Sequence, residues 1–173
     1  RNDPKTSGGT FVLGDLGTHA LHLATLITGQ QVHQVSADCQ SFVEGRVLED
    51  NAHVLLRFEG GAAGYLWASG VAVGHRHGLA IRVFGSKAGI EWHQERPNQL
   101  LYSPLGETPL VLELDSPELH PAAKRLLRVM AGHPEGYFEA FSNIYSDFAE
   151  ALITRLSGNI PDPASMDFPT LED

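Results

Sequence analysis

The middle of the chain is a series of short alternating segments joined by glycine- or proline-containing turns, and this feature constrains the fold most strongly. One pair of segments flanks Glu59-Gly60-Gly61 and another flanks Gly85-Ser86-Lys87-Ala88, and each pair is typical of a β-hairpin. The expected strands cover residues 31–43, 51–58, 62–71, 79–84 and 89–94, followed by the shorter segments 99–103 and 110–114. Because short turns join consecutive strands in opposite directions, the sequence predicts a predominantly antiparallel, mixed sheet of about six strands.

Helical patterns flank the strands at both ends. Residues 15–28 form an amphipathic segment that we expect to end at Gly29, because glycine commonly follows the last residue of a helix. Across residues 135–155, apolar residues recur at three- and four-residue steps, which predicts a long second helix whose aromatic residues we assign to the core. The periodic residues are Phe138, Phe141, Tyr145, Phe148, Ala149 and Leu152.

Strands between two helices predict an α+β domain in which the helices cover one face of an open-faced sheet. The expected inward positions of the first strand are Val32, Val35, Ala37 and Cys39. The opposite face stays open and carries Trp67, Tyr65 or their alternating neighbours. Exposed apolar area of this kind commonly marks an interface.

Composition limits the class of protein. A length of 173 residues, 42% of them hydrophobic and 19% charged, suits a single globular domain over residues 1–173. The formal net charge of −9 argues against nucleic acid or an anionic membrane as partner, and no run approaches the ~20 apolar residues of a membrane span. The single cysteine, Cys39, excludes an intramolecular disulfide and suits a reducing cytoplasm. Since the chain opens at Arg1 without an initiator Met, we interpret it as a piece of a longer polypeptide.

Three titratable side chains share one face at the start of the first helix. At about 100° per residue, Asp15, His19 and His22 fall at roughly 0°, 40° and −20°. The expected core stripe lies beside them and consists of Leu16, Leu23 and Ile27. Taken alone, Asp15 is also an ordinary first-turn acid, favoured by the helix N–H groups and the helix dipole.

This trio allows two kinds of chemistry. In the first, an imidazole exchanges a proton with a substrate hydroxyl or carbonyl, and the neighbouring carboxylate orients it or binds the same substrate. In the second, Asp15, His19 and His22 supply oxygen and nitrogen ligands to a metal ion, with His75 and His77 as possible further ligands. The sequence has neither the GxGxxG order of a dinucleotide-binding loop nor the GxSxG of a nucleophile elbow. The residues alone therefore do not identify a redox cofactor.

Several sequence blocks resemble one known family, over nearly the whole chain. They are Gly8-Gly9-Thr10, Asp15-Leu16-Gly17-Thr18-His19, Asp50-Asn51-Ala52, Phe58-Glu59-Gly60-Gly61, residues 85–92, residues 132–137 and residues 168–173. In these blocks the chain is similar to the second domain of the glucose–fructose oxidoreductase / inositol dehydrogenase / MocA family. The resemblance implies an open-faced mixed sheet that builds a substrate site and packs against another subunit.

The same resemblance implies NAD(P)-dependent oxidation or reduction of sugars, cyclitols and related polyols in the full-length protein. By motif match, His19 is the proton donor or acceptor at the reacting oxygen, and Asp15 is its substrate-binding partner. His22 occupies a position where many relatives have Asp, and His133 resembles a residue that reaches the substrate pocket. We expect both of these histidines to bind substrate; the alternatives are that His22 only shapes the pocket and that His133 only begins the last long helix.

Two departures from the family pattern limit what this chain does alone. The dinucleotide-binding Rossmann domain, with its glycine-rich loop and the catalytic lysine of a Glu-Lys-Pro motif, is absent from the sequence. The chain also stops at Leu171-Glu172-Asp173, where relatives continue into a final helix. We therefore expect a domain for substrate binding and homo-oligomerisation that binds no NAD(P) or metal by itself and is inactive alone. A non-catalytic dimerisation or binding module is the alternative.

Overall fold

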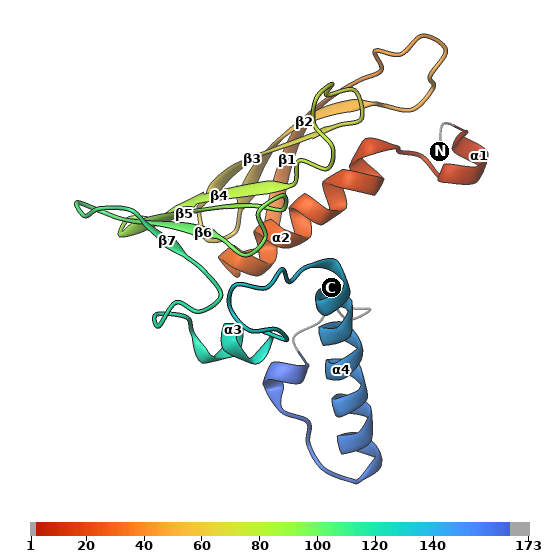
Figure 1. The fold of residues 1–173 in the computed structure, drawn as a ribbon. Helices are drawn as coiled ribbons and strands as arrows, with labels where there is room; N and C mark the ends of the chain where they lie inside the picture. The colour runs from red at the N-terminus through yellow and green to blue at the C-terminus, as the bar shows by residue number, and fades with distance from the viewer. Residues whose placement is uncertain (1–2, 167–173) are drawn as a thin grey trace. The chain divides into compact units, whose positions relative to one another are not determined.

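The computed structural model describes residues 3–166, and these fall into two compact units, residues 1–95 and residues 96–173 (Figure 1). The last block of the family resemblance, residues 168–173, lies outside the described residues.

The N-terminal unit begins with helices and continues into strands. Its elements are α1 (Pro4–Ser7), the π-helical turn η1 (Leu13–Gly17), α2 (Thr18–Thr28), β1 (Val32–Gln40), β2 (Asn51–Phe58), β3 (Ala63–Ser69), β4 (Ala80–Phe84) and β5 (Ala88–His93). Strands β1, β2 and β3 form an antiparallel sheet in that order, with Val54 opposite Ala37 on one side and Leu66 on the other. Strands β4 and β5 pair antiparallel in a second sheet, and a hydrogen bond from the Gly85 N–H to the Ala88 carbonyl closes the turn between them.

The C-terminal unit contains β6 (Leu100–Pro104), β7 (Leu110–Leu112), α3 (Pro121–Arg125), α4 (Tyr137–Leu156) and the 3₁₀ turn η2 (Pro163–Ser165). Strands β6 and β7 pair antiparallel. The guanidinium of Arg125 donates two hydrogen bonds, of 2.7 and 3.2 Å, to the carboxylate of Asp147 and so joins α3 to α4. The predicted α+β class, with open antiparallel sheets and a C-terminal helix, is therefore confirmed.

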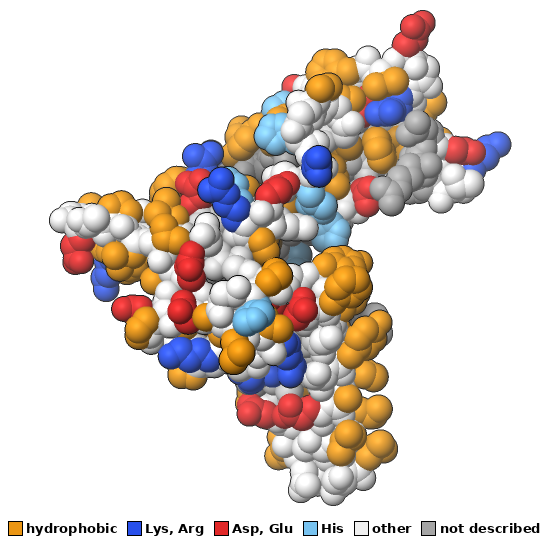
Figure 2. Space-filling model, in the orientation of Figure 1, with side chains coloured by type: hydrophobic (Ala, Val, Ile, Leu, Met, Phe, Trp, Pro, Cys, Tyr) orange, Lys and Arg blue, Asp and Glu red, His pale blue; other side chains and the backbone are white. Residues whose placement is uncertain are grey.

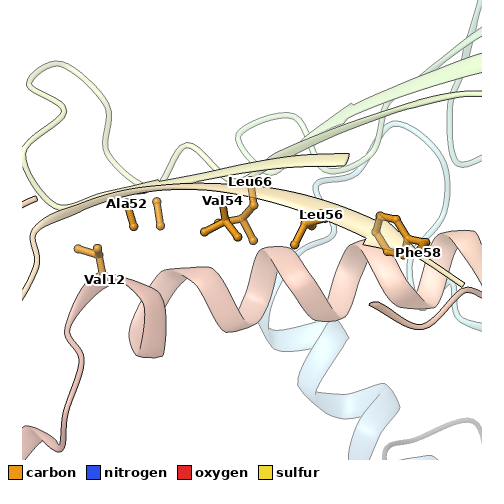
Figure 3. Packing of buried hydrophobic residues seen from close by; sticks show 7 residues of the cluster. Val12, Ala52, Val54, Leu56, Phe58 and Leu66 are labelled. Atoms are coloured by element: carbon orange, nitrogen blue, oxygen red, sulfur yellow. The ribbon is translucent and has the colours of Figure 1, made fainter. Parts of the chain in front are cut away.

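The core of the N-terminal unit lies between α2 and the inner face of β2 and β3 (Figure 3). Its buried members are Val12, Ala52, Val54, Leu56, Phe58, Leu66 and Ala68. Alternation along β2 sends every second side chain toward the helix, because successive strand residues point to opposite faces. The helix ends as predicted at Gly29, which has a φ of +63° and donates its N–H to the Thr25 carbonyl.

Two details of this core were predicted wrongly. Leu16 of η1 and Ala20 and Ala24 of α2 pack against the core, whereas Ile27 of α2 is 40% exposed. On β1, Val35 and Cys39 are exposed, although they pair with the core residues of β2. The core is centred on β2 and β3. Alternation in β1 therefore identified the residues that share a face with the core, but it did not predict that Val35 and Cys39 are exposed.

The aromatic side chains of α4 are exposed, contrary to the prediction that they form core. Ala151 is the one buried residue of this helix, while Phe138 is 80%, Tyr145 69% and Phe148 59% exposed. Hydrophobic side chains follow the helix in Figure 2. Helical periodicity predicts an apolar stripe correctly, but it does not specify a surface on which the stripe packs.

Replacing Leu56 by Ala should destabilise the chain by about 2–4 kcal/mol, because its side chain is buried between β2 and α2 and a cavity would remain. Leu55, the next residue and 52% exposed, is the matched control. Its change to Ala should cost less than about 1 kcal/mol. Urea denaturation measures both free energies of unfolding, and equal losses would contradict this description of the core.

Candidate functional site

A π-helical turn precedes α2 and carries Asp15. The Thr18 N–H donates to the Leu13 carbonyl, which is the five-residue spacing of a π-helix. Small residues allow this wide turn: a Cβ on Gly14 would lie 2.8 Å from Cγ2 of Thr10. The α-helix therefore starts at Thr18, three residues later than the sequence predicts. Single π turns are frequently found at functional sites.

The carboxylate of Glu49 holds this turn from a distant part of the sequence. Its Oε1 accepts hydrogen bonds from the N–H groups of Phe11 (2.9 Å) and Leu13 (3.1 Å) and from the Thr10 hydroxyl. Burial raises the pKa of Glu49, but these hydrogen bonds outweigh that effect and hold the pKa below its ordinary value. Glu49 thus acts as an N-terminal cap supplied by another segment.

A cavity of about 420 Å³ opens in the N-terminal unit where β3 and β4 belong to separate sheets. Helix α2, both strands and the loop of residues 70–79 line it. Its volume lies in the range usual for small-molecule sites. The cavity therefore has room for a ligand of sugar size.

The cavity lining contains basic residues and no carboxylate. Among its lining residues are His19 from α2, His75 and His77 from the loop and Arg82 from β4, and none of them is Asp or Glu. This differs from the chain as a whole, which carries a net charge of −9. Imidazoles donate and accept hydrogen bonds at once, so the lining suits hydroxyl groups.

The structure brings together only some of the predicted site residues. His19 lines the cavity, whereas Asp15 is half-buried in the π turn one helical turn earlier. His22 is exposed on α2 and is not among the lining residues. His133 belongs to the C-terminal unit, where its N–H donates to the Met130 carbonyl in the turn before α4.

Sequence reasoning did not predict that His75 and His77 lie on the cavity wall with His19. It considered them only as possible metal ligands, and the H-x-H spacing in a glycine-flanked loop was the available signal. In residues 3–166, no three His, Cys, Asp or Glu side chains come together in a way that could hold a metal ion.

Similarity to known proteins extends along the chain. Residues 1–91 match the family model of the GFO/IDH/MocA C-terminal domain. The uncharacterized oxidoreductase YfiI of Bacillus subtilis (strain 168) is 44% identical over 154 residues, which cover 88% of this chain and 39% of that protein. An oxidoreductase from Sinorhizobium meliloti is 45% identical with a TM-score of 0.87, over 93% of this chain and 45% of that one.

An inositol dehydrogenase homolog from Azotobacter vinelandii is also similar. Its complex with NAD+ gives 43% identity and a TM-score of 0.85, over 95% of this chain and 45% of that one. Its complex with NADH and myo-inositol gives 43% identity and a TM-score of 0.82, over 92% and 45%. The chain thus spans less than half the length of these relatives.

None of the helices described is both long and apolar enough to cross a membrane.

Replacing Glu49 by Ala should lower the free energy of unfolding by about 1–2 kcal/mol at neutral pH, as for the loss of other helix caps. Because the pKa of Glu49 is lowered in the folded chain, its stabilising effect is complete above the ordinary carboxyl pKa and is lost as pH falls through the folded-state value. Urea denaturation at several pH values measures this. Glu44→Ala, an exposed acid of the same loop, is the control, and a loss independent of pH would contradict the role of the charge.

Proposed function

This chain belongs to the family of GFO/IDH/MocA C-terminal domains, and from that membership we propose that it supplies the substrate pocket of an NAD(P)-dependent dehydrogenase of sugars, cyclitols or related polyols. The observation that carries the proposal is the position of His19 on the wall of a cavity of about 420 Å³. The Azotobacter vinelandii relative, complexed with NADH and myo-inositol, supports the substrate class.

The proposal assigns NAD or NADP to another part of the full-length protein. A dinucleotide site of the Rossmann type needs parallel strands joined through a helix and a glycine-rich turn. The strand pairs with a described register are all antiparallel, and the sequence contains no GxGxxG. Residues 3–166 therefore do not fit the dinucleotide by themselves, and a Rossmann domain must supply its site.

The contribution of this chain is to bind the polyol and move a proton. Oxidation of a secondary alcohol to a ketone releases a hydride, for which the nicotinamide is the acceptor, and a proton. His19 takes the hydroxyl proton, since a neutral imidazole is a general base near physiological pH. Asp15, one turn earlier, binds the same substrate, and His22 and His133 stay predictions as further substrate-binding residues.

The outer face of β1, β2 and β3 supports a second role as an oligomerisation surface. Tyr65 is 59% and Trp67 51% exposed, and the His53 ring stacks against both, with centroids 5.8 and 6.1 Å apart. We propose that this face contacts a second copy of the protein, because exposed aromatic area commonly marks an interface. The lone Cys39 supports a cytoplasmic location.

In the full-length protein, replacing His19 by Asn should reduce kcat for myo-inositol oxidation by about 10² or more, because the proton acceptor is lost. His33→Asn is the matched control, since His33 is an exposed histidine of β1 outside the cavity lining. Formation of NADH followed by absorbance measures both rates. Near-normal turnover by the His19 variant would contradict the proposed mechanism.

Replacing Leu55 by Asp should weaken self-association of the full-length protein, because Leu55 is 52% exposed on the central strand of the outer face. A charge placed there would have to be desolvated in a dimer. Leu26→Asp, on an exposed position of α2, serves as the control. Analytical ultracentrifugation compares the dissociation constants. A monomeric unmodified protein at high micromolar concentration would favour a different role for this face.

A further inference from the structure

A series of hydrogen bonds leads from the carboxylate of Glu49 to the backbone of Asp15. The Phe11 N–H donates to Oε1 of Glu49 at 2.9 Å, and the Phe11 carbonyl accepts the Asp15 N–H at 3.0 Å. The Thr10 hydroxyl donates to the same carboxylate oxygen and accepts the Gly14 N–H at 3.3 Å. The backbone on the N-terminal side of Asp15 is therefore held relative to Glu49 through two residues.

A second series leads from Glu49 to the residue before His19. The Leu13 N–H donates to Oε1 of Glu49 at 3.1 Å, and the Leu13 carbonyl accepts the N–H of Thr18, the first residue of α2. Successive turns of a helix are closed by backbone hydrogen bonds, so the first turn sets the direction of the residues that follow. The position of His19 on the cavity wall therefore depends on the same carboxylate.

The backbone that carries Glu49 is fixed at the edge of the sheet. The next residue, Asp50, donates its N–H to the Gln40 carbonyl at the end of β1 and accepts the Gly70 N–H, just after β3, at distances of 2.9 and 2.8 Å. Val12, at the start of the π turn, is fully buried in the core (Figure 3). A buried side chain and the Glu49 carboxylate thus attach the turn to the sheet at two points.

We propose that Glu49 is a positioning residue for proton transfer, which holds Asp15 and His19 in the geometry that the reaction needs. The inference rests on the proposed function, in which His19 takes the hydroxyl proton. Reaction rates depend steeply on such geometry, since a displacement of about 1 Å can lower a rate about 10²-fold. Glu49 is not among the residues that line the cavity, so it acts through the turn and not on the substrate.

The test measures kcat and KM for myo-inositol in the full-length protein with NAD+. Glu49→Ala should lower kcat about tenfold or more, and this fall should exceed any rise in KM, because the reacting groups are displaced while the cavity remains. Glu49→Gln should recover part of the lost kcat, because its amide oxygen still accepts hydrogen bonds from N–H groups.

Two control variants separate positioning from simple loss of stability or of an acid. Val54 is buried in the same core but lies outside the cavity lining and the Glu49 hydrogen bonds, so Val54→Ala should lower the free energy of unfolding and keep kcat. Glu44→Ala removes an exposed acid of the same loop and should leave kcat unchanged. An equal loss of kcat in Val54→Ala and Glu49→Ala would overturn the assignment, since destabilisation would account for both.

The variant His19→Asn distinguishes failure of this inference from failure of the proposed function. If His19→Asn is slow, adding Glu49→Ala should lower kcat little further, because the residue that Glu49 positions is already lost. A further fall by the same factor, or a normal kcat for Glu49→Ala alone, would overturn the role of Glu49 and leave the proposed function standing. Near-normal turnover by His19→Asn would overturn the proposed function itself.

Hydrogen exchange of the Phe11 and Leu13 amides on the same proteins needs no substrate. Both amides should exchange faster in Glu49→Ala than in Val54→Ala, because only the first variant removes their acceptor. Unchanged exchange in Glu49→Ala would overturn the positioning role whatever the turnover.

Discussion

The candidate site depends on the hydrogen bonds that the carboxylate of Glu49 accepts. One oxygen accepts two backbone N–H groups and a hydroxyl from residues 10–13, so it joins the start of β2 to the turn before α2. Without an acceptor these N–H groups would be left without a partner at a partly buried helix start, which is energetically costly. By fixing the π turn, Glu49 also fixes the direction in which α2 leaves it and hence where His19 reaches the cavity.

The neighbouring residue, Asp50, stabilises a second segment in the same way. The buried Asp50 carboxylate accepts the Phe42 and Val43 N–H groups and a hydrogen bond from Arg46. Burial raises the pKa of Asp50, but the hydrogen bonds and the charge of Arg46 outweigh it and lower the pKa. The guanidinium of Arg46 lies 5.3 Å from the ring centroid of Phe11. Two adjacent acids thus organise the loop after β1 and the turn before α2.

The candidate cavity opens where β3 and β4 belong to separate sheets. Neighbouring strands of one sheet leave no room between them, whereas strands of different sheets leave a space that a loop and a helix can line. The cavity therefore combines a rigid wall, α2 with His19, and a loop wall that carries His75 and His77. Binding residues on loops positioned by a rigid scaffold are common in enzymes.

Local patterns in the sequence predicted the hairpins, the end of α2 at Gly29 and the spacing of Asp15 and His19, because turns and helical periodicity depend on residues close along the chain. The cap from Glu49, the π turn and the position of His19, His75 and His77 around one cavity were not predictable in this way. They depend on contacts between residues far apart in the sequence. For the same reason, periodicity identified the apolar stripe of α4 but wrongly assigned it to the core. The sequence by itself determined which side chains alternate; tertiary packing decided which of them are buried and which share a cavity.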